Sequence, residues 1–267
     1  MELTGRTVLV TGAGRGLGRA ISVAAARAGA TVVGGSRTTE DLDRLGAEIT
    51  AEGGVFHGKR LDVTDLASIE EFVAAARRRF GRIDGLVNNT GAGVSVASLD
   101  IDAEQFASTF DFNTRSMFFC SQAAGRSMLE HGGAIVNISS NFAVAGVGVR
   151  SVYCAAKAAV DSLTRSLAVE WAPHGIRVNA VAPGTMNTPG YERARRNAPE
   201  MVKSVITATP SGRVAEPEEV AALVVFLLTD ACAAMTGQIM AVDGGQSVPL
   251  AVLSVPKNRP VPEPAGF

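Results

Sequence analysis

Long apolar runs are missing from the sequence. None of its 267 residues falls in a stretch of about 18 to 20 apolar residues, the length that a membrane-spanning helix requires. The first residues, MELTGRTVLVTG, pass from a polar start directly into a short β-like run and contain no apolar signal region. We therefore expect a cytoplasmic protein that does not contact a membrane.

An excess of charge of one sign is missing as well. The formal net charge is -1, and the sequence has no basic stripe or aromatic stacking platform of the kind that binds nucleic acid. The run Arg77-Arg78-Arg79 is better explained as the solvated face of a helix end. These features exclude nucleic acid from the expected partners.

Cysteine and histidine are scarce. The three cysteines, Cys120, Cys154 and Cys232, lie far apart and show no metal-type pairing, so we expect reduced and buried side chains. The three histidines are equally scattered, and each is followed by a glycine in a predicted turn. The sequence therefore predicts no metal site.

Short β-branched runs alternate with longer helical patterns along the whole chain. Such alternation is typical of a parallel sheet that is covered by helices on both faces. The chain is 46% hydrophobic, and no linker or fixed-period repeat divides it. We predict a single α/β domain over residues 1–248, with a doubly wound parallel sheet of about seven strands. The recognised strand runs are TVLVTG, TVVGGS, GLVNN, AIVNISS, IRVNAVAP and QIMAVDGG.

A proline-rich tail, residues 249–267, follows this domain. Repeated proline prevents regular helix or central strand. We expect the tail to be disordered or to lie in extended form over a surface, such as that of a neighbouring subunit.

The segment TGAGRGLG follows the first predicted strand and opens the first predicted helix. In a doubly wound sheet this turn presents backbone N–H groups and a helix N-terminus to a pyrophosphate. Glycine at positions 12, 16 and 18 permits positive φ and close approach to a ligand, whereas Leu17 stands where a commoner motif has its last glycine. An ordinary glycine-rich turn is the alternative. We favour a dinucleotide site that includes Gly12, Gly16, Leu17 and Gly18.

The end of the second predicted strand indicates which dinucleotide is bound. Sites for NAD usually place a carboxylate there to bond the ribose 2′-hydroxyl, but this chain has Ser36 followed by Arg37. A guanidinium suits a 2′-phosphate, and Arg15 in the glycine turn offers a second contact. The alternative is that both arginines are merely exposed. The sequence favours NADP over NAD.

Tyr153 and Lys157, in SVYCAAK, lie one turn apart on one face of a predicted helix. A phenol holds its proton tightly at neutral pH, and we expect the nearby ammonium to lower its pKa, which makes Tyr153 a general acid or base. Ser140 ends a strand run at the carboxyl edge of the sheet, where it can bond a substrate oxygen beside Tyr153. We expect Ser139 to face away.

Over about residues 3–247 the sequence resembles the short-chain dehydrogenase/reductase family, in its branch of roughly 250-residue enzymes with a Rossmann fold. The matching motifs, in order, are TGAGRGLG, LDVTD, NNTG, SVYCAAK and APGTMNT. One departure is Thr90, which replaces the alanine of the family's usual N-N-A-G motif, and we expect it to tune affinity only. The family also includes 3-oxoacyl carrier-protein reductases, which the chain resembles.

The resemblance implies roles for individual residues. Asn113, Ser140, Tyr153 and Lys157 would form the catalytic tetrad, in which Asn113 holds a water and Lys157 also bonds the nicotinamide ribose. Asp62 would meet the adenine, Asn89 the adenosine ribose and Thr188 the nicotinamide carboxamide. The full expected cofactor set is Gly12, Arg15, Gly16, Leu17, Gly18, Ser36, Arg37, Asp62, Val63, Asn89, Tyr153, Lys157, Pro183, Gly184, Met186 and Thr188.

The expected activity is hydride transfer between NADP(H) and a small carbonyl or secondary alcohol, most simply reduction of an apolar ketone. Segments bordering the substrate are small and apolar. A lid is expected near residues 188–213. Its Arg193, Arg195 and Arg196 either bind an acidic carrier protein or a phosphate-bearing thioester, or are simply solvated. An NAD-dependent alcohol dehydrogenase and a non-catalytic dinucleotide-binding protein are the rival hypotheses. The resemblance further implies a homotetramer built through residues 102–128, 152–172 and the last strand.

Overall fold

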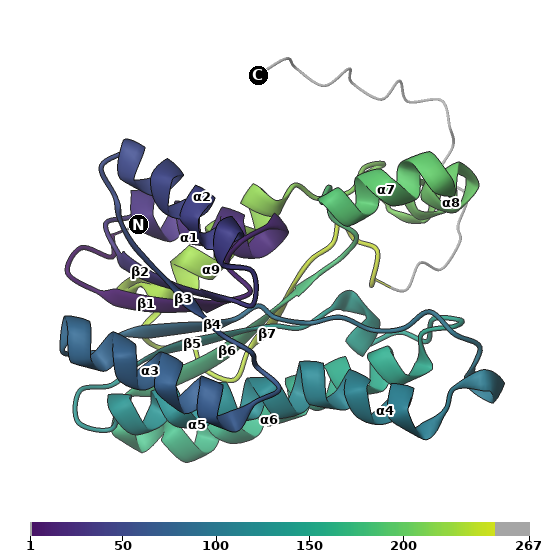
Figure 1. The fold of residues 1–267 in the computed structure, drawn as a ribbon. Helices are drawn as coiled ribbons and strands as arrows, with labels where there is room; N and C mark the ends of the chain where they lie inside the picture. Colours follow the sequence, from purple (N-terminus) through teal and green to yellow (C-terminus); the bar gives the residue numbers. More distant parts are fainter. Residues whose placement is uncertain (1, 249–267) are drawn as a thin grey trace.

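Seven parallel strands form one sheet in the order β3-β2-β1-β4-β5-β6-β7 (Figure 1). The computed structural model describes residues 2–248, so the predicted tail over 249–267 lies outside the described residues. The strands are β1 (Thr7–Thr11), β2 (Thr31–Ser36), β3 (Val55–Arg60), β4 (Gly85–Asn88), β5 (Gly133–Ile138), β6 (Ile176–Pro183) and β7 (Ile239–Val242). The predicted single-domain, doubly wound α/β fold is confirmed.

Helices cover both faces of this sheet (Figure 1). The helices are α1 (Gly16–Arg27), α2 (Thr39–Ala51), α3 (Leu66–Phe80), α4 (Ala103–Phe110), α5 (Ser116–Met128), α6 (Ser151–Trp171), α7 (Pro189–Asn197), α8 (Pro199–Ala208) and α9 (Pro217–Leu228). In Figure 1, α1, α2 and α9 lie above the sheet, and α3, α5 and α6 lie below it. Helices α7 and α8 stand apart, beyond the carboxyl end of β6.

The edge strand β3 was not among the sequence runs recognised as strands. Its residues Val55–Arg60 read VFHGKR, and none of them is fully buried. An edge strand that is covered on one side needs no continuous apolar run. Its hydrophobic pattern is therefore too weak to identify it as a strand from the sequence alone.

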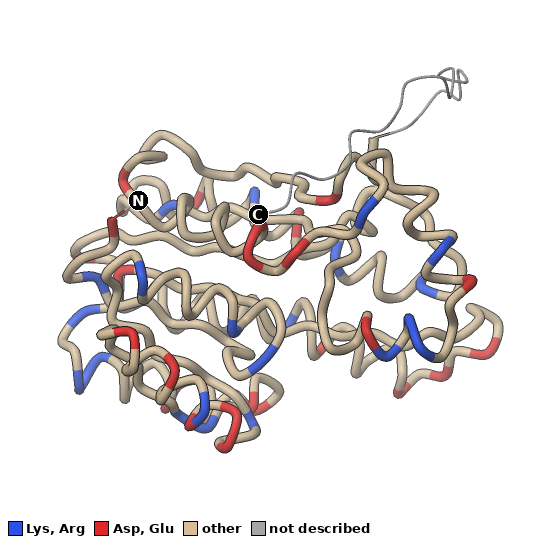
Figure 2. Tube along the Cα trace, turned by 90° about the horizontal axis from the view of Figure 1, so that it is seen from above, with Lys and Arg blue, Asp and Glu red and all other residues tan. Residues whose placement is uncertain are grey.

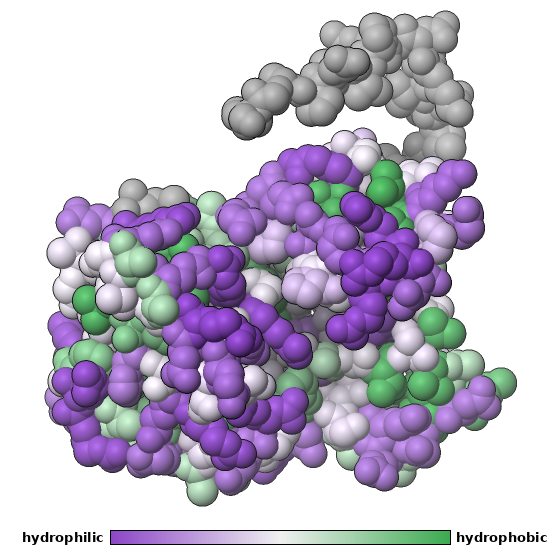
Figure 3. Space-filling view, turned by 45° about the horizontal axis from the view of Figure 1, so that its top comes forward, coloured by the Kyte–Doolittle hydropathy of each residue, from purple (hydrophilic) through white to green (hydrophobic). Residues whose placement is uncertain are grey.

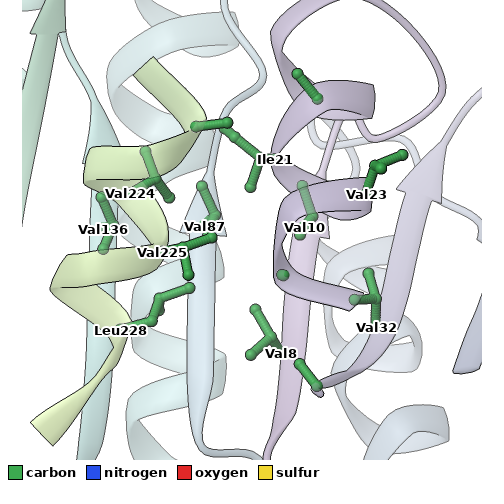
Figure 4. Packing of buried hydrophobic residues seen from close by; sticks show 14 of the residues in the cluster. Val8, Val10, Ile21, Val23, Val32, Val87, Val136, Val224, Val225 and Leu228 are labelled. Carbon is green, nitrogen blue, oxygen red and sulfur yellow. The ribbon is translucent and has the colours of Figure 1, made fainter. Parts of the chain in front are cut away.

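Alternating side chains of the central strands build two cores, one on each face. On the upper face Val8, Val10 and Val87 pack with Ile21 of α1 and Val224 of α9 (Figure 4). On the lower face the intervening residues, among them Leu9, Leu86 and Ile135, pack against α3 and α5. All of these side chains are buried, and each contributes about 1.5–3 kcal/mol by leaving water. Burial on both faces explains why these strands read as continuous apolar runs.

Charged residues of both signs are interspersed along the trace (Figure 2). Arg77, Arg78 and Arg79 occupy the last turn of α3 and are exposed, as predicted. Cys120 and Cys232 are buried, whereas Cys154 is half-buried. Within residues 2–248 no helix is long and apolar enough to cross a membrane, and no group of three metal-ligating side chains was found.

Candidate active site

A cleft of about 450 Å³ opens at the carboxyl edge of the sheet, beside α6. Most residues expected to bind the cofactor or to react line it: Gly12, Arg15, Leu17, Gly18, Ser36, Arg37, Val63, Asn89, Ser140, Tyr153, Lys157, Pro183, Gly184 and Met186. Four others, Gly16, Asp62, Asn113 and Thr188, are not part of the lining. The fold thus brings together segments that are far apart in sequence.

The glycine turn after β1 has the geometry that its sequence predicts. Gly12 and Gly16 adopt positive φ values of 65° and 54°, which L side chains rarely adopt. A side chain at Gly18 would collide with the carbonyl oxygen of Gly12, so the helix can start here only with glycine. Asn89 fixes the turn, because its Nδ2 donates to the carbonyl oxygens of Thr11 at 3.0 Å and Gly12 at 3.1 Å. The amide of Asn89 therefore supports the turn directly.

Arg37 lines the cleft at the end of β2, and its guanidinium lies 5.5 Å from the centroid of the Phe112 ring. Arg15 lines the same cleft from the glycine turn. Asp41, near the start of α2, also lines it and forms an ion pair with Arg44. Two cations and one carboxylate that is already paired therefore border this part of the cleft.

Asp62 is engaged by its own turn. Its carboxylate accepts hydrogen bonds from the backbone N–H of Thr64 at 3.0 Å and from the Thr64 hydroxyl at 2.8 Å. These two bonds lower the pKa of Asp62, and the charge of Arg37 contributes in the same direction. Its flanking residues Leu61 and Val63, rather than Asp62 itself, line the cleft.

Thr188 caps the N-terminus of α7, where its hydroxyl accepts a hydrogen bond from the N–H of Tyr191 at 3.3 Å. A Cβ added to Gly16 would lie 3.9 Å from the Thr188 methyl group. The start of the expected lid segment therefore lies next to the glycine turn.

Tyr153, Ser140 and Lys157 converge on the cleft. The phenol lies beside the Ser140 hydroxyl, and Lys157 is 3% exposed, with its Nζ 5.7 Å from the centroid of the Tyr153 ring. Gly93 packs on the tyrosine, because a Cβ added there would lie 2.6 Å from a ring carbon. Phe142 meets the ring edge-on, with centroids 6.4 Å apart. The phenol is thereby held in one orientation.

The electrostatics of Tyr153 differ from the sequence-based expectation. Burial raises the pKa of Tyr153 above its ordinary value, and the opposing influences come from the Ser140 hydroxyl and the charge of Arg150. Lys157 instead donates a hydrogen bond from Nζ to the carbonyl oxygen of Ile138 at 2.9 Å. Burial lowers the pKa of Lys157 to about 8. The expectation that Lys157 lowers the pKa of Tyr153 is wrong for this structure.

Asn113 sits in a π-helical turn, Asp111–Arg115, which joins α4 to α5. Such turns occur frequently at functional sites. Its Nδ2 donates to the carbonyl oxygens of Thr109 and Ala92, and its buried Oδ1 has no hydrogen-bond partner among the described residues. Around Gly91 this oxygen and the Lys157 ammonium face the same point, since a Cβ there would lie 2.8 Å from the one and 2.9 Å from the other.

Asp161 lies one helical turn beyond Lys157 and is 4% exposed. Burial raises the pKa of Asp161, whereas the Ser139 hydroxyl and the charges of Arg165 and Lys157 lower it. Ser139 lies close enough to Asp161 to affect its pKa, but its buried hydroxyl forms no hydrogen bond within residues 2–248, and Ser139 lines the cleft beside Ser140. The expectation that Ser139 faces away stays a prediction. The charge of Asp161 in turn opposes the lowering of the pKa of Lys157.

Sequence reasoning missed several residues of the site. Gly91, Ala92 and Phe112 line the cleft. Gly91 belongs to the NNTG motif, which could have identified it, whereas Ala92 and Phe112 carry no such signal. Asp41 and Arg150 are charged, but their positions depend on how the loops pack. Spacing from Tyr153 on α6 is the one signal that could have identified Arg150.

The cleft fits a nicotinamide dinucleotide. The glycine turn leaves room for close backbone approach, Arg15 and Arg37 line the cleft, and Tyr153 and Lys157 line it near the end of β5. This arrangement offers backbone donors and cations to phosphates at one end, and a proton donor at the other.

Comparisons with known proteins agree with this arrangement. A family model described as enoyl-(acyl carrier protein) reductase matches residues 12–247. L-xylulose reductase of Bos taurus is 39% identical over 247 residues, which cover 92% of this chain and 98% of that protein. The 3-oxoacyl-[acyl-carrier-protein] reductase of Thermotoga maritima is 37% identical over 246 residues, 92% of this chain and 99% of that protein.

Solved structures are similar over nearly the same length. A short-chain type dehydrogenase/reductase from Mycobacterium ulcerans superposes with a TM-score of 0.89 at 31% identity, over 92% of this chain and 91% of that one. An actinorhodin polyketide ketoreductase variant with NADPH gives a TM-score of 0.88 at 32% identity, over 93% and 100% of the two chains.

Proposed function

The chain belongs to the short-chain dehydrogenase/reductase family, and on that premise we propose that it is an NADP-dependent oxidoreductase that reduces a ketone. The observation that carries the proposal is the convergence of Tyr153, Ser140 and Lys157 on the cleft that also contains the glycine turn. When bound there, the nicotinamide dinucleotide supplies the hydride.

Tyr153 is the proton donor in this proposal. Burial keeps its pKa above the ordinary value, so the phenol is protonated at neutral pH and can give its proton to the alkoxide that develops from a ketone. Ser140, beside the phenol, donates a hydrogen bond to the same substrate oxygen. This protonation state favours the reducing direction, since oxidation requires the phenolate.

Lys157 and Asn113 help to return a proton to Tyr153 after it has protonated the substrate. The buried Lys157 ammonium and the Asn113 Oδ1 face one point next to Gly91, so both are available to a chain of hydrogen bonds that leads away from Tyr153. Lys157 also orients the nicotinamide ribose, and Asn89, Pro183, Gly184, Met186 and Thr188 complete the cofactor contacts.

Arg37 and Arg15 support the preference for NADP, because both residues line the cleft and a guanidinium suits a 2′-phosphate. Asp41 favours the second candidate, an NAD-dependent secondary alcohol dehydrogenase, because a carboxylate in this region repels a phosphate. Its ion pair with Arg44 reduces that repulsion, so we retain NADP.

The substrate in this proposal is a small carbonyl compound or the matching secondary alcohol. The names of the relatives include a sugar reductase and a reductase of 3-oxoacyl thioesters, so both kinds of carbonyl are candidates. Residues 188–213, with α7 and α8, form the lid, and apolar residues are exposed at that end of the molecule (Figure 3). Arg193 and Arg196 on α7 are exposed, and Arg195 pairs with Glu192 at 3.5 Å.

A homotetramer built through α4, α5, α6 and β7 completes the proposal. Phe106 of α4 is 50% exposed and stacks on Phe110, and Val169 of α6 is 80% exposed, which gives apolar surface to cover. Light scattering after size-exclusion chromatography measures the oligomeric state directly.

The experiment that tests the activity is a panel of ketones, and of the corresponding alcohols, assayed with NADPH and NADH and with their oxidised forms. Absorbance of the reduced nicotinamide reports turnover. Faster reduction with NADPH supports the proposal, whereas turnover that is confined to alcohols and NAD supports the second candidate.

A further inference from the structure

Arg150 is the N-cap residue of α6 and stands three positions before Tyr153. Its φ of -131° and ψ of 12° are not helical, so it lies just before the helix that carries Tyr153 and Lys157. Lys157 lines the cleft together with the glycine turn, whereas the Arg150 side chain reaches the loop after β4, where Gly93 lies against the Tyr153 ring. Its charge is close enough to favour the phenolate form of Tyr153.

The side chain of Arg150 is fixed in this place. Its Nη1 donates to the carbonyl oxygen of Gly93 at 3.2 Å, and Gly93 in turn packs on the Tyr153 ring. Two further hydrogen bonds join the same two segments, from the Val96 N–H to the Val149 carbonyl oxygen at 3.1 Å and between the hydroxyls of Ser98 and Ser151 at 2.9 Å. The loop after β4 and the start of α6 therefore form one continuous wall.

Besides the guanidinium this wall carries the hydroxyls of Ser98 and Ser151. Its apolar side chains include Ala92, Val94 and Val96 from the loop after β4 and Val149 from the segment before α6. Arg150 is half-buried and forms no salt bridge within residues 2–248, so a single carbonyl oxygen is its hydrogen-bond partner there. A cation with only one neutral acceptor in such surroundings retains donors for an anion.

One local feature opposes the placement of a cation here, and the residue before Arg150 is strained. Arg150 precedes the first residue of a 21-residue helix with no acidic residue in its first turn, and the positive end of the helix dipole disfavours a cation. Val149, just before it, has a φ of 56°, and it is the one non-glycine residue with positive φ within residues 2–248. Such strain occurs at ligand sites, where the surrounding contacts hold it in place.

We propose that Arg150 is a specificity residue that binds an anionic group of the substrate, so that the preferred substrates are ketones with a carboxylate, sulfonate or phosphate a few bonds from the carbonyl. This inference rests on the proposed function, because it assigns the substrate class of the same site. A guanidinium binds such groups through two parallel hydrogen bonds, which fixes the orientation of the ketone relative to Tyr153 and Ser140.

Matched pairs of keto acids and their methyl esters test this inference. The pairs are 4-oxopentanoate, 5-oxohexanoate and 6-oxoheptanoate with their esters, which vary the distance between carbonyl and charge. We expect kcat/KM for the best acid to exceed that for its ester by about 10- to 100-fold, the contribution of hydrogen bonds to a charged group. In Arg150→Met this ratio falls to about 1, and Arg150→Lys retains a ratio several-fold above that of Arg150→Met.

The ratio of acid to ester cancels any effect of Arg150 on the ionisation of Tyr153, which both substrates share. Arg78→Met is the matched control, since it removes an equal charge from the exposed end of α3 and should leave the ratio unchanged. A wild-type ratio near 1 for all three pairs, or a ratio that Arg150→Met does not alter, overturns the inference even though the proposed function stands.

A binding measurement tests, without turnover, whether Arg150 binds the anionic group. In calorimetric titrations of wild-type protein saturated with NADP⁺, the dissociation constant of 5-oxohexanoate should be about tenfold or more below that of its methyl ester. In Arg150→Met this difference should disappear. Equal or undetectable binding of the acid contradicts the inference. Absence of turnover for every ketone, together with tight binding of the acid that depends on Arg150, refutes the proposed reduction but keeps the anion site.

Discussion

Lys157 donates from its Nζ to the carbonyl oxygen of Ile138 at 2.9 Å, so the ammonium is anchored to the end of β5 rather than to the phenol of Tyr153. The two side chains share a helix face and a cleft, but they do not share a proton directly. The lysine is therefore placed to bond a ribose and to exchange protons with groups around Gly91.

The pH dependence of the two reaction directions should differ. Reduction requires protonated Tyr153, whose pKa burial raises, and charged Lys157, whose pKa burial lowers to about 8. We expect kcat/KM for reduction to stay level through neutral pH and to fall above about pH 8, where Lys157 loses its charge. Oxidation should accelerate over the same range, because it requires the phenolate. Rate profiles from pH 6 to 10 in both directions measure this; parallel profiles would contradict it.

Asp161→Asn should shift the descending limb of the reduction profile to lower pH. The charge of Asp161 raises the pKa of Lys157, so its removal lets burial lower that pKa further. The charged and titratable groups around Asp161 are Lys157 and Arg165 on α6, and the Ser139 hydroxyl, just past β5, also lowers the pKa of Asp161. Asp43→Asn, at an exposed position of α2, should leave the profile unmoved. A reduced rate without displacement of the limb would assign Asp161 a purely structural role.

Gly93→Ala should lower kcat with little change in thermal stability. The added Cβ would lie 2.6 Å from a ring carbon of Tyr153, so the tyrosine must shift from its position. Gly93 has no positive φ, and the backbone therefore tolerates alanine. We expect a loss of about 10²-fold in kcat, as misplacement of a reacting group by about 1 Å causes. Gly146→Ala, where a Cβ meets open space, is the control; equal activity of both variants would show that the ring is not held by Gly93.

Arg37→Ala should weaken binding of NADPH by about 10- to 100-fold and leave NADH nearly unaffected, since only the former has a 2′-phosphate for the guanidinium. Fluorescence titration of each reduced cofactor measures both constants. Arg60→Ala is the matched control, because Arg60 is exposed at the end of the neighbouring strand β3. Equal weakening of both cofactors would mean that Arg37 acts through the adenosine or through folding instead.

The sheet and the position of the cleft could be predicted from the sequence because buried parallel strands read as apolar runs, and because glycine is required where backbone approaches backbone, as at Gly18. The edge strand β3 lacked such a run. The ionisation of Tyr153 could not be predicted, because it depends on burial and on how Ser140 and Arg150 are oriented. The role of Arg150 could not be predicted, because its position depends on a hydrogen bond to the carbonyl oxygen of Gly93, a residue 57 positions away in the sequence.

The most direct test of the central claim, that Tyr153 donates the proton in a dinucleotide-dependent reduction, is a comparison of wild type with Tyr153→Phe. The variant keeps the ring that packs on Gly93 and Phe142 and removes only the hydroxyl. We expect kcat for ketone reduction to fall by about 10²- to 10⁴-fold, the usual contribution of a general acid, while the dissociation constant of NADPH changes less than about threefold. A Tyr153→Phe protein that reduces the ketone at the wild-type rate would contradict the account.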